Sequence, residues 1–410
     1  MSTISIPRLF GFKRIKVNYA EALDESTAGV SVSPDKRYSL ICSVCDKTVK
    51  KVHMHRERVV RDIPLGIFRK VYVNIHYRLV KCTHCNKIHV EASDVTDVGG
   101  PRVTKRMARL IQFLCETHTV TEVADLLQLD WKTVKNIDKA GLKEDYGETD
   151  YTGLRILAID EIAYSKHHKY LTIVMDYETG RVVWTGEGRK ADTLREFFNG
   201  MPEEVRQGIE AVAMDMWPAY AKVVEEACPQ AAIVYDLFHI VAKYNRVIDD
   251  VRREEIAKAK KEDKPVISGS RWILLKNRDN LKDSELPRLE ELLAVNENLA
   301  KVYILKDDLK VIWKYDEREL MAQALTDWCT RAIEAELPSL NRFVRLIERH
   351  WEGILNHACH PISNGRLEGT NNKIKVIKRE SYGFHDLEYF QLKIKQRCSG
   401  KQEKGQHLRR

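Results

Sequence analysis

The chain has 410 residues, of which 43% are hydrophobic and 31% are charged, and its formal net charge is +8. This length predicts two to four domains. No apolar stretch is long enough to span a bilayer, and residues 1–13 lack the apolar core of a signal peptide. The composition therefore excludes a membrane-embedded protein and predicts a cytoplasmic one.

The positive charge is concentrated at the two ends of the chain. Residues 1–150 carry a net charge of +6, residues 151–365 carry −5, and residues 366–410 carry +7. Basic ends around an acidic middle suit a protein that grips a polyanion while its centre holds cations. Ordinary solvated faces are the alternative interpretation of this asymmetry.

Four of the nine cysteines occur in two Cys-x-x-Cys pairs, Cys42 with Cys45 and Cys82 with Cys85. Four thiolates satisfy a tetrahedral structural zinc ion, and an odd total argues against a disulfide framework. The β-rich stretch between the pairs predicts a hairpin that brings them together. We expect a structural Zn²⁺ here; two unrelated pairs of free thiols are the alternative.

The first three segments in chain order are a lead-in, a β module and a helical domain. Residues 1–37 are interpreted as a polar N-terminal lead-in, and residues 38–98 as the zinc-binding β module. Residues 99–150 form the helical domain, in which 121–139 reads as a helix-turn-helix. Asp130 is expected to cap its second helix. The side chains expected to face DNA are Trp131, Lys132, Thr133, Lys135 and Asn136; a plain helical hairpin is the alternative.

From residue 151 the pattern becomes α/β. Residues 151–240 read as three strands in a meander, then helix, strand, helix and strand, which predicts a mixed sheet with helices on its faces. Residues 241–355 read as an all-helical insertion. Residues 356–398 return to the sheet domain with a helix around Glu368, and residues 399–410 form a basic tail. The predicted fold class is therefore multidomain α/β.

Three acidic residues are candidates for a shared metal site. Asp160 and Asp215 each end an apolar run that reads as a buried strand, which places a carboxylate at the rim of the sheet. Glu368 lies on a helix whose other face carries the apolar residues. Convergent carboxylates can hold two divalent cations, which cleave and join phosphodiester bonds. Helix capping is the alternative role for either aspartate alone, and Asp176 also ends a strand.

The helix around Glu368 also carries the amide and basic side chains expected near DNA. The residues predicted to face the nucleic acid are Asn371, Lys373, Lys375, Lys378 and Arg379. An ordinary solvated helix face is the alternative.

These motifs together resemble the ISL3-family insertion-sequence transposases, members of the DDE group. The likeness includes the cysteine pairs, residues 131–135 in the helix-turn-helix, 158–161, 215–220, 363–375 and 382–384. It implies an RNase H-like core interrupted by the helical insertion. It assigns the catalytic, metal-binding triad to Asp160, Asp215 and Glu368, with two Mg²⁺ ions that Mn²⁺ can replace. It also places Asp236 and His239, in an Asp-x-x-His sequence, as supports behind the triad.

The resemblance implies a DNA transposase that binds the terminal inverted repeats of its element and catalyses Mg²⁺-dependent cleavage and strand transfer. Its partners would be double-stranded DNA, as ends and as target, and further copies of the chain in a homodimer or higher oligomer. The expected location is the prokaryotic cytoplasm, associated with the nucleoid. The alternative function is that of a domesticated DNA-binding regulator with the same fold.

Overall fold

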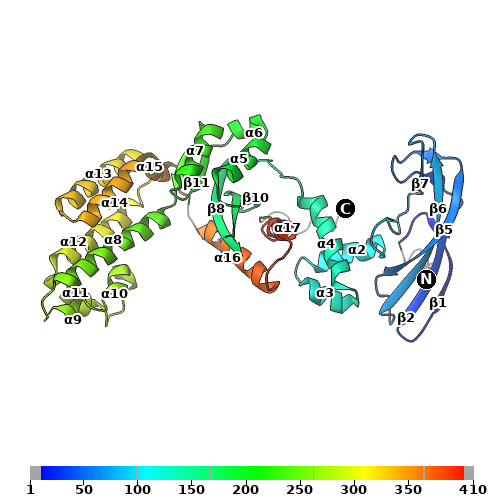
Figure 1. Cartoon of the computed structure of the whole chain (residues 1–410), viewed down its shortest axis with the longest axis horizontal. Coiled ribbons are helices and arrows are strands. Elements are labelled where there is room, and N and C mark those ends of the chain that lie inside the picture. Colours follow the sequence, from blue (N-terminus) through cyan, green and yellow to red (C-terminus); the bar gives the residue numbers. More distant parts are fainter. Residues whose placement is uncertain (1–10, 98, 166–168, 262, 363–364, 401–410) are drawn as a thin grey trace, which may run out of the picture. The chain divides into compact units, whose positions relative to one another are not determined.

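The computed structural model describes residues 11–97, 99–165, 169–261, 263–362 and 365–400. The chain divides into two compact units (Figure 1). The first contains residues up to 148 together with 386–397, and the second contains residues 149–385 and those from 398 onward. Residues 363–364 of the Glu368 motif and 401–410 of the predicted basic tail lie outside the described residues.

The first unit begins with a five-stranded sheet. It consists of β1 (Ile15–Ala22), β2 (Thr27–Pro34), β5 (Val52–Asp62), β6 (Lys70–Cys82) and β7 (Lys87–Val90). The strands β5 and β6 form the antiparallel hairpin expected between the cysteine pairs, whereas β2 runs parallel to β6. A separate ribbon joins β3 (Leu40–Ile41) to β4 (Thr48–Val49). The lead-in expected over residues 1–37 is therefore corrected, because 15–34 contribute two strands to this sheet.

The helical part of the first unit contains α2 (Lys105–Leu114), α3 (Val120–Leu127) and α4 (Trp131–Tyr146). The turn from α3 to α4 passes through Gln128 in the left-handed conformation, with φ of 51°. Asp130 caps α4 as expected, because its carboxylate accepts hydrogen bonds from the backbone of Lys132 and Thr133. The C-terminal helix α17 (Leu387–Arg397) also belongs to this unit. The expectation that residues 356–398 all return to the sheet domain is therefore corrected for this helix.

The second unit is built on a mixed five-stranded sheet in the order β10-β9-β8-β11-β12. Its strands are β8 (Ile156–Ser165), β9 (Lys169–Asp176), β10 (Val182–Glu187), β11 (Ala211–Met214) and β12 (Ala232–Tyr235). The first three form the expected antiparallel meander, and β11 and β12 run parallel to β8. The alternation of strands and helices predicted from the sequence is confirmed.

Helices cover both faces of this sheet (Figure 1). One face packs against α5 (Ala191–Gly200), α6 (Glu203–Gln207) and α7 (Pro218–Ala227), around Phe197 and Tyr220. The other face packs against α16 (Gly365–Glu380), whose Leu367 contacts Ala158 and Ala213. Side chains alternate along a strand, so each strand contributes to both cores.

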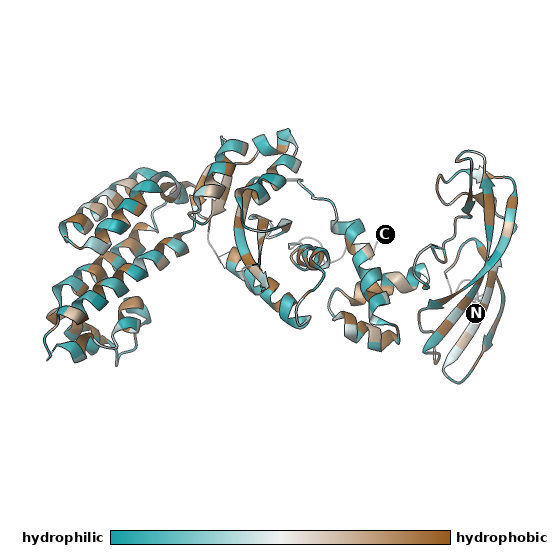
Figure 2. Ribbon diagram, in the orientation of Figure 1, coloured by the Kyte–Doolittle hydropathy of each residue, from teal (hydrophilic) through white to brown (hydrophobic). Residues whose placement is uncertain are grey.

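An all-helical segment separates β12 from α16, as predicted. Its helices are α8 (Leu237–Lys258), α9 (Lys264–Ile267), α10 (Arg271–Leu275), the 3-10 turn η1 (Arg278–Asn280), α11 (Leu286–Val295), α12 (Glu297–Ile312), α13 (Arg318–Glu334), α14 (Pro338–Arg349) and α15 (Trp351–Cys359). Figure 2 shows apolar stripes along these helices, and their buried residues form one core around Trp328. Among the described residues, no helix has the length and apolarity needed to cross a membrane.

Candidate active site

Three aspartates follow one another across three neighbouring strands of the second unit. Ala158 on β8 pairs with Ala213 on β11, and Ala213 pairs with Val234 on β12. Asp160, Asp215 and Asp236 each lie two residues beyond these partners. Because the three strands are parallel and side chains alternate, all three aspartates belong to the face that α16 covers. We call this set the carboxylate row.

Asp160 is fixed at both carboxylate oxygens. Its Oδ1 accepts a hydrogen bond from the backbone N–H of Glu161 at 2.8 Å, and its Oδ2 accepts one from Nδ2 of Asn371 at 2.5 Å. Burial raises the pKa of Asp160, and the charge of Asp215 acts in the same direction. The carboxylate is thus oriented, partly desolvated and close enough to Asp215 to be repelled by it.

His239 lies between the other two members of the row. Its Nδ1 is 3.4 Å from Oδ2 of Asp215, and its Nε2 is 3.5 Å from Oδ2 of Asp236. Asp236 caps α8 by accepting from the backbone of Phe238 at 2.7 Å, which places His239 in the first helical turn. Burial raises the pKa of Asp236 to about 6. The Asp-x-x-His sequence therefore connects the strand end of β12 to the strand end of β11.

Glu161 is a titratable group beside the row that the sequence analysis did not assign to the site. It follows Asp160 on β8, and burial, aided by the charges of Asp160 and Asp215, raises its pKa to about 7. It interacts with Tyr220 on α7, whose hydroxyl lies 2.7 Å from that of Thr172. The only feature of the sequence that could have assigned Glu161 to the site is its position next to Asp160.

Glu368 lies in the first turn of α16 and is exposed. Among the described residues it makes no hydrogen bond or ion pair, and Asn371, one turn further along α16, is the residue that contacts Asp160. Within the described residues, no set of three carboxylates has ligand atoms within 4.8 Å of one another. The structure therefore connects Asp215 and Asp236 through His239 and puts Asp160 on the same sheet face, and among the described residues Glu368 makes no contact with them at hydrogen-bond distance.

The carboxylate row fits divalent cations of the magnesium type. Mg²⁺ prefers carboxylate oxygens, usually one or two from the protein with water and phosphate completing the shell. Asp160, in the middle of β8, and Asp215, directly after β11, supply such oxygens on one sheet face, and their mutual repulsion is the interaction that a cation relieves.

The four cysteines form the cluster predicted from their spacing, and this cluster could hold a metal ion. The Sγ atoms of Cys42, Cys45, Cys82 and Cys85 all lie within 4.8 Å of one another. A hydrogen bond from the backbone of Cys85 lowers the pKa of Cys82 to about 7, whereas hydrogen bonding to the Cys45 thiol raises the pKa of Cys85. The residue that follows each pair, Asp46 or Asn86, has a left-handed backbone conformation with φ of 54°. Two matching knuckles thus present four sulfurs with the geometry and chemistry of a zinc site.

The residues predicted to face DNA are divided by the structure. On α4, Trp131, Lys132 and Asn136 are exposed, whereas Thr133 and Lys135 are half-buried. The Lys135 ammonium lies 2.9 Å from Asp386, so its charge already has a partner. On α16, Lys373, Lys375 and Arg379 are exposed and Lys378 is half-buried, whereas Asn371 is half-buried and donates to Asp160.

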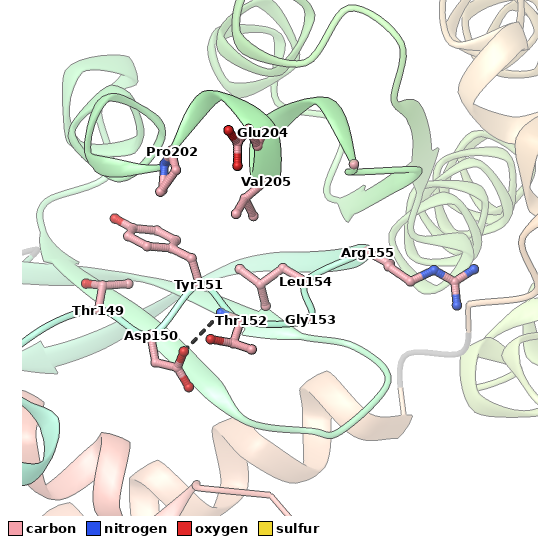
Figure 3. Close-up of a pocket in the computed structure, with 11 residues that line it drawn as sticks. Thr149, Asp150, Tyr151, Thr152, Gly153, Leu154, Arg155, Pro202, Glu204 and Val205 are labelled. Carbon is pink, nitrogen blue, oxygen red and sulfur yellow. Dashed lines mark hydrogen bonds between the residues drawn. The ribbon is translucent and has the colours of Figure 1, made fainter.

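The second unit also contains a cavity of about 700 Å³ away from these carboxylates. Residues 149–155 and the start of α6 line it, and Figure 3 shows Tyr151 beside Pro202 and a hydrogen bond between Asp150 and Thr152. No member of the carboxylate row lines it. We therefore place the candidate active site at the carboxylate row, between the sheet and α16.

A helix-turn-helix in the same chain as a sheet that carries a row of aspartates is the combination expected of a DNA transposase. Residues 157–394 match the DDE-domain model of the ISL3 transposases, described as "Transposase", and residues 100–141 match the "Helix-turn-helix domain of transposase family ISL3". The chain is 40% identical over 360 residues to the transposase for insertion sequence element IS1001 of Bordetella parapertussis, covering 87% of this chain and 88% of that one. It is 30% identical over 298 residues to the transposase for IS1557 of Mycobacterium tuberculosis, covering 67% of each. The chain belongs to the ISL3 family of transposases.

Proposed function

We propose that this transposase binds the terminal inverted repeats of its element and cleaves and joins DNA in a Mg²⁺-dependent reaction. The observation that carries the proposal is the carboxylate row, which places Asp160 and Asp215 on one sheet face beneath the helix of Glu368. The strand order and the helices on both faces support an RNase H-like core. The proposed domains are the zinc-binding module, the helix-turn-helix domain, and the sheet domain with its helical insertion. Residues 15–34 and α17 are assigned to the first unit.

In this mechanism Asp160, Asp215 and Glu368 would be the residues that hold two divalent ions, with Asp160 contributing to both. Two bound Mg²⁺ ions, or Mn²⁺ in their place, would activate a water molecule for in-line attack and stabilise the leaving 3′ oxygen. Asp236 and His239 hold Asp215 in place, because His239 spans both carboxylates. No protein nucleophile is required, since the freed 3′ hydroxyl attacks the target DNA.

DNA binding is assigned to both basic ends of the chain. The exposed Trp131, Lys132 and Asn136 of α4 would contact the inverted repeats, with the zinc module beside them in the same unit. Lys373, Lys375 and Arg379 of α16 would neutralise phosphates near the site. Because two DNA ends must be paired, we expect a homodimer or higher oligomer, located in the cytoplasm on the nucleoid.

The test is a strand-transfer assay with Mg²⁺ and DNA that carries the element's ends. Wild type is compared with Asp215→Ala, Glu368→Ala and the control Glu225→Ala, an exposed acidic residue on α7. The first two variants should lose both cleaved and joined products while binding the ends normally, and the control should keep them. Equal product from all variants would remove the catalytic assignment. End binding by a wild type that forms no product would favour the DNA-binding regulator.

A further inference from the structure

One side chain of α16 contacts a member of the carboxylate row directly. Nδ2 of Asn371 donates to Oδ2 of Asp160 at 2.5 Å, joining residues 211 positions apart in the chain. The other oxygen of Asp160 is already held by the backbone of Glu161. Each oxygen therefore has one donor and keeps a second lone pair available for a cation.

The helix does not depend on this contact for its place on the sheet. Leu367, Ile374 and Ile377 are buried beneath α16. Arg366 donates to the backbone oxygens of Tyr177 and Glu178 and lies over the Tyr177 ring at 5.2 Å. Loss of the Asn371 amide would leave these anchors intact, so its main effect should fall on Asp160.

We propose that Asn371 is a positioning residue that orients the Asp160 carboxylate for metal binding and sets the rotation of α16 that presents Glu368. This proposal rests on the proposed function above. Asn371 and Glu368 are three residues apart, so they lie on neighbouring positions of one helix face. The hydrogen bond thus links the strand that carries one acid to the helix that carries another.

The experiment compares Asn371→Ala with Asn372→Ala in the full chain. Asn372 is a matched control, because it is the same residue type on the same helix but is exposed and makes no hydrogen bond with Asp160. Mn²⁺ binding is measured by electron paramagnetic resonance without DNA, with Asp160→Ala as the baseline. DNA-end affinity, circular dichroism and cleavage across a Mg²⁺ series are measured in parallel.

We expect Asn371→Ala to raise the half-saturating Mn²⁺ and Mg²⁺ concentrations roughly 10-fold or more, as loss of an outer-shell partner does. DNA-end affinity and the metal-free melting temperature should match those of Asn372→Ala. Asn371→Gln, which keeps an amide donor, should recover part of the metal affinity.

Two results would overturn the proposal. The first is that Asn371→Ala and Asn372→Ala bind metal with the same half-saturating concentration, although Asp160→Ala abolishes binding. The other is a metal-free melting temperature that falls in Asn371→Ala, which would show a structural role. If wild type binds Mn²⁺ but never cuts DNA, the proposed function fails, and the Mn²⁺ comparison still decides the role of Asn371.

Discussion

A buried ion pair joins the C-terminal helix to the second helix of the helix-turn-helix. Oδ2 of Asp138 on α4 lies 2.8 Å from Nζ of Lys393 and accepts a hydrogen bond from the Tyr389 hydroxyl at 2.5 Å. The side chains of Asp138 and Lys393 are only 1% and 9% exposed. The Lys393 ammonium also donates to the backbone oxygen of Cys115 at 2.8 Å. The pair therefore connects α2, α4 and α17.

Lys393→Met keeps the stem of the side chain and removes the charge, which leaves the buried Asp138 carboxyl group without its cationic partner. Breaking such a pair costs about 3–5 kcal/mol. The Tyr389 hydrogen bond remains, so we expect the lower end, about 3 kcal/mol. Because 1.4 kcal/mol corresponds to a factor of ten, amide exchange in α4 and α17 should accelerate by about 100-fold.

Hydrogen exchange with mass spectrometry measures this change for each helix. Lys143→Met is the control, because Lys143 pairs with Glu388 at the surface, where both side chains are about half exposed and such pairs contribute about 1 kcal/mol or less. The double variant with Asp138→Asn should recover part of the lost protection. Equal exchange in Lys393→Met and Lys143→Met would refute the reasoning.

Four further predictions follow from single contacts. Cys82→Ser should reduce bound zinc from one ion per chain to none, measured by elemental analysis. Asp386→Asn should lower the free energy of unfolding by about 1 kcal/mol at pH 7, because it removes the ion pairs with Lys135 and Lys139. Although burial opposes it, pairing with two α4 lysines holds the pKa of Asp386 below its ordinary value. Asp386 therefore stabilises the fold above about pH 4. The difference in unfolding free energy between wild type and Asp386→Asn, measured by urea titration, should vanish as the pH falls further. Gly353→Ala would place a Cβ 2.4 Å from the Tyr235 ring, so it should lower the melting temperature through about 1–3 kcal/mol of overpacking. Lys375→Gln should reduce the salt slope of DNA binding by about one, measured by fluorescence anisotropy.

Local patterns in the sequence predicted much of the second unit. The apolar runs before Asp160 and Asp215 are strands, and side-chain alternation puts both acids on one face. The expectation that Asp160 ends its strand was wrong, because β8 continues to Ser165. The Asp130 cap and the cysteine knuckles also follow from short-range spacing. These features could be predicted because each depends on residues close together in the chain or on ligand chemistry.

Features that depend on distant partners were not predictable in the same way. The strand β2 pairs in parallel with β6, about 40 residues later, so no hairpin turn marks their pairing. Similarly, α17 has an ordinary helical pattern, but its packing on α4 depends on the Asp138–Lys393 pair across more than 250 residues. Periodicity identifies a helix without identifying the surface that it covers.

The rotation of α16 is the remaining step from sequence to site, and it explains why Asn371 rather than Glu368 meets Asp160. Periodicity places both residues on one face, and the anchors of Leu367 and Arg366 determine which one contacts the strand. Three residues of helix rise about 4.5 Å. Ions in two-metal sites lie about 3.5–4 Å apart. In the proposed mechanism, an acid one helical turn from the Asp160 contact is therefore suitably spaced to reach the second of two metal ions that Asp160 would share. A ligand set spread along α16 in this way would assemble fully only when the cations, with their bound waters and phosphates, fill the gap.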